Sequence, residues 1–104
     1  MLNFYETREQ ATQAMLQEIK HCEKYVDKAM EDLDEGRLPE SIIILDFANV
    51  AYQCAEQARK FLEEHSIEGL TEDEQAAVNE MDRITGKLNN CLIQFKLTAR
   101  RGRN

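Results

Sequence analysis

The chain has 104 residues, of which 42% are apolar and 32% charged, with four glycines and one proline. This length fits a single domain, and the composition excludes a disordered linker and a collagen-like or proline-rich segment. The longest aliphatic run, residues 42–45, is far shorter than the roughly 18 residues of a membrane span. The N-terminus lacks the basic and then apolar pattern of a secretory signal. We therefore expect one cytoplasmic domain over residues 1–104, with no membrane partner.

The net charge of −7 is unevenly distributed. Residues 1–35 carry four basic and nine acidic side chains, residues 36–75 three and nine, and residues 76–104 six and two. An acidic body argues against broad adhesion to nucleic acid or anionic lipid, because phosphate binding needs clustered Lys and Arg.

The first predicted helix covers residues 3–34. Its apolar residues recur in steps of four and three and form one seam, namely Met15, Ile19, Cys22, Val26, Ala29 and Leu33. Gly36 should end this helix in the left-handed conformation. At the N-terminal end of this helix, Phe4 and Tyr5 either pack against its first turns or form an exposed aromatic anchor for a partner.

The second predicted helix covers residues 39–65, with Pro39 at its first position. Its polar residues form one narrow stripe, and the rest is almost wholly apolar. One apolar flank is large (Ile43, Phe47, Val50, Cys54, Phe61) and the adjoining flank is small (Ala48, Ala51, Ala55, Ala58). This apolar arc is wider than the roughly 100° of an ordinary surface helix. We therefore expect this helix to need covering on more sides than one neighbour provides.

The first turn of this helix places large aliphatic side chains all the way round its axis, so at least one of them should face outward. The predicted partner-binding residues here are Ile42, Ile43, Leu45 and Phe47. The partner that binds these residues is either a second copy of the chain or another protein.

The third predicted helix covers residues 72–99 and opens with Thr71 and Glu74 at capping-box spacing. Its seam again follows steps of four and three, through Ala77, Met81, Ile84, Leu88, Cys91 and Phe95. Short connections force neighbouring helices to run antiparallel. The predicted fold is an all-α, up-down-up bundle of three long helices that forms a homodimer through the 39–65 helix.

A basic C-terminal tail, residues 100–104, follows the third helix, and no acidic residue follows Asp82. Arg100, Arg101 and Arg103 are a secondary electrostatic site. We expect Lys96, Arg100 and Arg101 to complement the acidic cluster at the first connection and the dipole of the helix, with contact to a partner protein or to nucleic acid as alternatives. That cluster comprises Asp32, Asp34, Glu35 and Glu40.

The three cysteines, Cys22, Cys54 and Cys91, form no CxxC pair and suit a reducing compartment. All three fall on apolar faces, so we expect buried thiols. Cys22 and Cys54 should lie at the same level of the bundle, which leaves an oxidation-sensitive pair as an alternative.

Glu18 and His21 form a single ExxH pattern, whereas di-iron bundles use two. His21 also points away from the seam of its helix. The sequence therefore predicts neither a metal site nor a cofactor.

Arg59 and His65 are six residues apart. This spacing is similar to the R-x(4–6)-H motif of HEPN ribonucleases, which are small helical bundles, and the resemblance implies RNA cleavage by this pair. In an unbroken helix the two side chains would point about 120° apart.

These patterns favour a small non-enzymatic interaction module, such as an adaptor, a chaperone-like protein or a regulator, that binds a partner helix through an apolar surface. Two alternatives stay open. One is an acidic regulator or inhibitor of nucleic-acid machinery, and the other is a HEPN-like ribonuclease or toxin–antitoxin component.

Overall fold

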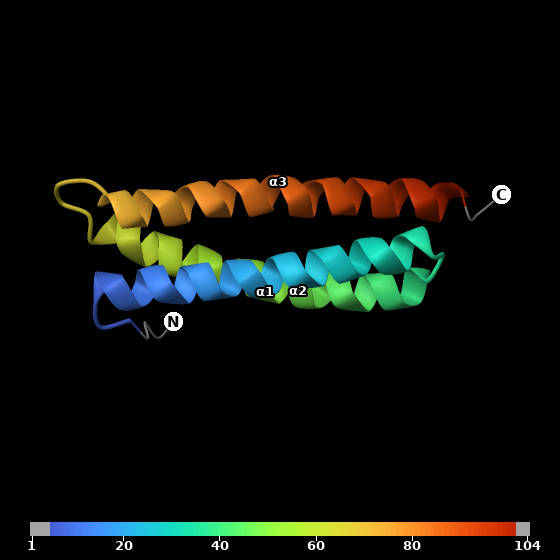
Figure 1. Ribbon diagram of the computed structural model, residues 1–104, viewed down its shortest axis with the longest axis horizontal. Helices are drawn as coiled ribbons and strands as arrows, with labels where there is room; N and C mark the ends of the chain where they lie inside the picture. The colour runs from blue at the N-terminus through green and yellow to red at the C-terminus, as the bar shows by residue number, and fades with distance from the viewer. Residues whose placement is uncertain (1–4, 102–104) are drawn as a thin grey trace.

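A computed structural model describes residues 5–101 as three helices, namely α1 (Arg8–Asp34), α2 (Leu38–Glu64) and α3 (Glu72–Arg101). Within that range no residue lies in a strand. Consecutive helices run antiparallel, and α1 packs against both α2 and α3 (Figure 1). The predicted all-α, up-down-up three-helix bundle is confirmed.

Local backbone requirements explain where α1 begins and ends and where α2 begins. α1 begins at Arg8, later than the predicted residue 3, because the Thr7 hydroxyl accepts the Gln10 N–H at 3.1 Å and fixes the first turn there. At the other end Gly36 has a φ of 80°, the left-handed conformation expected of it. Pro39 lies in the first turn of α2, where its missing N–H is tolerated.

The predicted capping box at the start of α3 is confirmed. The Thr71 N–H donates to Glu74 Oε1 at 2.9 Å, and the Glu74 N–H donates to Thr71 Oγ1 at 3.2 Å. Arg8 Nε also donates to Glu74 Oε2 at 2.8 Å, and its other nitrogens donate to the carbonyls of His65 and Gly69. One arginine therefore joins the start of α1 to the second connection and to the start of α3.

The predicted seams of α1 and α3 form the core, except that Phe95 at the end of the α3 seam is only partly buried. α2 meets these seams mainly through small residues. Ala48, Ala51, Ala55 and Ala58 are each at most 4% exposed. We call these four residues the alanine face of α2. Because alanine projects only a methyl group, this face lets α2 approach α1 at the short end of the usual 8–10 Å between helix axes.

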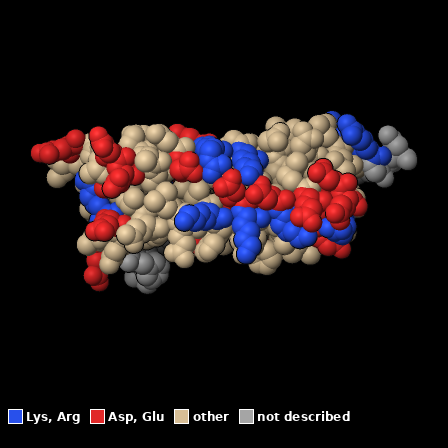
Figure 2. All heavy atoms as spheres, in the orientation of Figure 1, with Lys and Arg blue, Asp and Glu red and all other residues tan. Residues whose placement is uncertain are grey.

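Ion pairs fasten the middle of α3 to α1. Glu23 accepts hydrogen bonds from Arg83 at 2.9 and 3.0 Å and from Lys87 at 2.9 Å, and Lys87 also pairs with Asp27 at 2.6 Å. Figure 2 shows basic side chains over the middle of α3 beside acidic ones over α1. Hydrogen bonds from Arg83 and Lys87 lower the pKa of Glu23 to about 2.

We predict that the Glu23 contacts stabilise the bundle in a pH-dependent way. Because the folded pKa lies below the ordinary value near 4.5, the stabilisation is present above pH 4.5 and is lost as pH falls toward 2. Glu23→Gln should lower the free energy of unfolding by about 1 kcal/mol at pH 7. Urea unfolding across this pH range should show the two proteins converging near pH 2.

Asp82→Asn is the control, since Asp82 is exposed in the middle of α3 and forms no ion pair within residues 5–101. The free energy of unfolding of this control should match that of the parent protein at every pH. A difference between Glu23→Gln and the parent that persists at pH 2 would contradict the assignment.

Candidate functional site

Large apolar side chains lie exposed along one flank of α2. Ile43 is 54% exposed, Phe47 52% and Val50 61%, and Cys54 is also exposed. Their spacing of four, three and four residues places all four on one face of the helix. We call Ile43, Phe47, Val50 and Cys54 the α2 stripe.

The α2 stripe faces away from α3. On α2 the hydroxyl of Tyr52 lies 3.1 Å from that of Thr85 on α3, which marks the flank that meets α3. At about 100° per residue, the stripe residues lie about 140–180° round the helix from Tyr52. From α1, Tyr25 packs on Phe47 with ring centroids 5.7 Å apart. The stripe therefore runs beside α1 on the side of the bundle opposite α3.

The width of the apolar arc explains why this stripe is uncovered. α1 covers the alanine face of α2, and α3 approaches the flank that carries Tyr52. Within residues 5–101 no further helix is left to cover the remaining flank. This agrees with the expectation that α2 needs more covering than its neighbours provide.

Of the predicted partner-binding residues in α2, Ile42, Ile43 and Phe47 are about half exposed, whereas Leu45 is only 5% exposed. The prediction that Leu45 belongs to the contact surface is therefore wrong. It lies three residues before Ala48 and shares its inward direction. Val50 was absent from the predicted contact set, although its four-and-three spacing with Phe47 and Ile43 is visible in the sequence.

At the N-terminus, Tyr5 packs onto α2. Its ring lies 5.5 Å from that of Phe61, and burial raises its pKa. Phe61 is 7% exposed, so the large flank of α2 divides into this buried end and the exposed stripe. Phe4, the other predicted aromatic contact, lies outside the described residues.

Arg100 and Arg101 lie exposed in the last turn of α3, and Arg103 lies outside the described residues. Within residues 5–101 neither Arg100 nor Arg101 forms an ion pair with the acidic cluster, so their complementing it stays a prediction. Within the cluster Arg37 pairs with Asp32 at 2.7 Å, and its hydrogen bond lowers the pKa of Asp32. Figure 2 shows the basic side chains at the C-terminal end of α3.

The three cysteines differ in their exposure to solvent. Cys22 and Cys91 are buried, as predicted, and burial raises the pKa of Cys22 to about 11. The prediction that Cys54 is buried is wrong, because it belongs to the exposed stripe. A buried Cys22 and an outward Cys54 do not face each other, which removes the basis for an oxidation-sensitive pair.

Arg59 and His65 have separate partners. Arg59 pairs with Glu56 and Glu63 on its own helix. The His65 ring stacks on that of Phe61 at 4.1 Å, and its Nδ1 lies 2.9 Å from the Phe61 carbonyl oxygen. The structure does not bring the two side chains of the HEPN-like spacing to one site.

The ExxH residues form only a local pair, with His21 Nδ1 3.4 Å from Glu18 Oε1. In the described part of the chain, His, Cys, Asp and Glu side chains form no group of three or more that could hold a metal ion.

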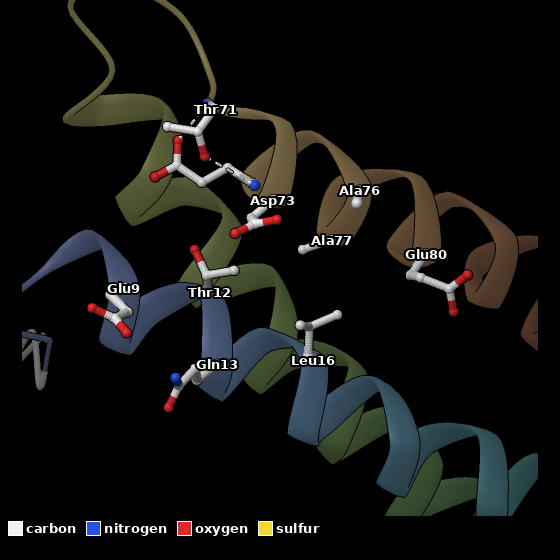
Figure 3. Close-up of a pocket in the computed structure, with 10 residues that line it drawn as sticks. Glu9, Thr12, Gln13, Leu16, Thr71, Asp73, Ala76, Ala77 and Glu80 are labelled. Carbon is white, nitrogen blue, oxygen red and sulfur yellow. Dashed lines mark hydrogen bonds between the residues drawn. The ribbon is translucent and has the colours of Figure 1, made fainter.

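A groove with an acidic rim lies between the N-terminal ends of α1 and α3 (Figure 3). Two of its carboxylates are already engaged, since Glu74 pairs with Arg8 and Glu80 with Arg83. Every buried polar side-chain atom in residues 5–101 has a hydrogen-bond partner. The groove was not predicted from the sequence because it joins segments some 60 residues apart. Its lining residues are Glu9, Thr12, Gln13, Leu16, Thr71, Asp73, Glu74, Ala76, Ala77 and Glu80.

Comparisons of the chain with protein-family models, curated proteins and solved structures found no significant match. None of the helices between residues 5 and 101 combines the length and the apolar character needed to cross a membrane.

We predict that the same substitution at two nearby aliphatic residues of α2 has a large effect on the free energy of unfolding at one and a small effect at the other. Leu45→Asp buries a charge without a partner and should cost more than about 4 kcal/mol, enough to unfold a small domain. Ile43→Asp stays at the surface and should change the free energy of unfolding by no more than about 0.5 kcal/mol. Circular dichroism during thermal unfolding measures both, and unfolding by Ile43→Asp would place the stripe in the core.

Proposed function

We propose that the chain is a small, non-enzymatic interaction module whose α2 stripe binds a helix of a partner protein. The observation that carries this proposal is the run of Ile43, Phe47 and Val50, each more than half exposed on one helix face. Contiguous exposed apolar surface marks interaction sites in soluble proteins. Apolar anchors spaced four and then three residues apart are typical of helix-to-helix recognition.

The surroundings of the stripe support this role. The buried alanine face lies beside it on α2, and Tyr25 of α1 supports Phe47 along one edge. Exposed Asp46 and Gln53 follow the other edge. An apolar centre with a polar rim is the usual composition of an interface.

The alternatives have less support. The HEPN-like spacing has no shared site, since Arg59 and His65 contact different groups. The acidic regulator rests on net charge and on the acidic groove, whose Glu74 and Glu80 are already paired. We infer a cytoplasmic location, because the exposed thiol of Cys54 suits a reducing compartment.

A photoreactive amino acid placed at position 47 tests the proposal in the cells that make the protein. Irradiation should give a discrete covalent adduct, because Phe47 lies at the centre of the stripe. Position 93 is the matched control, since Ile93 is 55% exposed on α3. The adduct is identified by mass spectrometry, and its binding is repeated with purified proteins and the Phe47→Asp variant.

An adduct at position 47 that is absent at position 93, with binding abolished by Phe47→Asp, is the expected result. Equal labelling at the two positions, or none at either, would contradict an interaction role for the stripe.

A further inference from the structure

We propose that Tyr5, Glu6 and Thr7 form a displaceable strap, which covers one end of the apolar flank of α2 and is released when a partner helix binds there. This inference rests on the proposed function, because it names how access to the same surface is regulated. The contact that carries it is the packing of the Tyr5 ring on Phe61, with ring centroids 5.5 Å apart.

Phe61 continues the line of the α2 stripe. It follows Cys54 by seven residues, or two turns of the helix, so the two side chains point in directions that differ by only about 20°. Phe61 is 7% exposed, whereas the residues of the stripe are exposed. Tyr5 contacts Phe61 together with His65, whose ring lies 4.1 Å from that of Phe61. The apolar surface of this helix face therefore continues beneath Tyr5.

Tyr5 lies on the side of Phe61 that faces the stripe. Burial raises the pKa of Tyr5, and the negative charges of Cys54 and Glu18 raise it further, so the Tyr5 hydroxyl is within electrostatic reach of Cys54. Cys54 is the last residue of the stripe. The ring of Tyr5 therefore lies in the path that a helix bound to the stripe would follow toward the end of α2.

Two hydrogen bonds anchor the strap to α1. The Glu6 N–H donates to Gln10 Oε1 at 2.9 Å, and the Thr7 hydroxyl accepts the Gln10 N–H at 3.1 Å. Figure 1 shows the described residues before α1 turning back beneath the start of that helix. Because both bonds are made to the first turn of α1 and not to α2, the Tyr5 ring can leave Phe61 while the cap of α1 stays intact.

A partner helix gains from the covered surface because the open one is short. From residue 43 to residue 54 the stripe extends about 16 Å along α2, which is little for an interface of the usual size, about 800 Å² on each partner. Toward the other end α2 begins at Leu38, so little helix is left there. Including Phe61 lengthens the apolar face to about 27 Å and adds a second aromatic anchor to Phe47.

Tyr5 and the partner helix therefore compete for Phe61. In the free protein the strap occupies this position, and the partner has to displace it before the whole face is available. Such a competing closed state lowers the apparent affinity for the partner by the fraction of molecules that are open.

Fluorine NMR with 3-fluorotyrosine tests the strap, because the three tyrosines of the chain report on three different places. Tyr5 reports on the strap, Tyr25 on the stripe through its contact with Phe47, and Tyr52 on the flank of α2 that meets α3. The probe is a synthetic amphipathic helix about 27 Å long that carries leucines in steps of four and three.

Adding this probe should shift the Tyr5 and Tyr25 resonances together and leave the Tyr52 resonance unchanged. The Tyr5 resonance should move to the position of a solvent-exposed tyrosine. A shift of Tyr25 without one of Tyr5 would overturn the strap and leave the interaction role standing. No shift of either resonance would contradict helix binding at the α2 stripe, and the strap with it.

Substitution of Tyr5 gives an independent check in the same titration. Tyr5→Ala removes the ring that competes with the probe and should tighten probe binding by about two- to tenfold, the equivalent of one aromatic pair. Tyr5→Phe keeps a ring on Phe61 and is the matched control, which should bind the probe as the parent does. Tyr25 and Tyr52 resonances at the parent positions establish that each variant is folded.

Unchanged binding of the probe by Tyr5→Ala would overturn the strap. Weaker binding would also overturn it, because Tyr5 would then belong to the contact surface and not compete with the partner for it.

Discussion

The close contact between the alanine face of α2 and α1 is the constraint on which the rest of the structure depends. Four alanines, each at most 4% exposed, occupy the core-facing positions in the middle of α2, with Leu45, Phe61 and Leu62 buried nearer its ends. Because they project so little, they allow α2 to approach α1 closely, and the larger side chains Ile43, Phe47 and Val50 lie on the neighbouring flank. The exposure of Ile43, Phe47 and Val50 is a consequence of this packing.

α3 completes the core without covering those side chains. It is fixed at one end by Arg8, which reaches the capping box through Glu74, and in the middle by Glu23 with Arg83 and Lys87. These contacts place α3 on the Tyr52 flank of α2, opposite the stripe. The bundle of three helices thus leaves an exposed apolar flank on α2, which is the surface that we propose binds a partner helix.

The helices of this fold were predictable because α1, and α3 as far as Cys91, follow one apolar seam, and a single seam has only one way to face a core. Beyond Cys91 the exposed Leu92, Ile93 and Leu97 of α3 lie off that seam. The turn signals at Gly36 and the pair Thr71 and Glu74 were equally direct, since each serves a specific backbone requirement. The start of α1 was placed too early because the Thr7 cap was not recognised.

The orientation of α2 was not predictable in the same way. Its apolar arc exceeds what two neighbours can cover, so the sequence leaves open which part is buried. Side-chain size does not decide the matter, because small residues permit a closer approach than large ones. This is why Leu45 was expected at the surface and Cys54 in the core, and why both expectations failed. The pairing of Arg37 with the acidic cluster was not predicted either, although Arg37 is next to that cluster in the sequence.

Thiol reactivity of the parent protein tests the orientation of α2 most directly. The three native cysteines report on two core positions and one position of the α2 stripe, and alkylation followed by peptide mass mapping resolves them individually. At nanomolar concentration, where a small interface is dissociated, Cys54 should react at the rate of an exposed thiol while Cys22 and Cys91 stay protected until the protein unfolds. Protection of Cys54 equal to that of Cys22 under these conditions would contradict the packing of α2 through its alanine face.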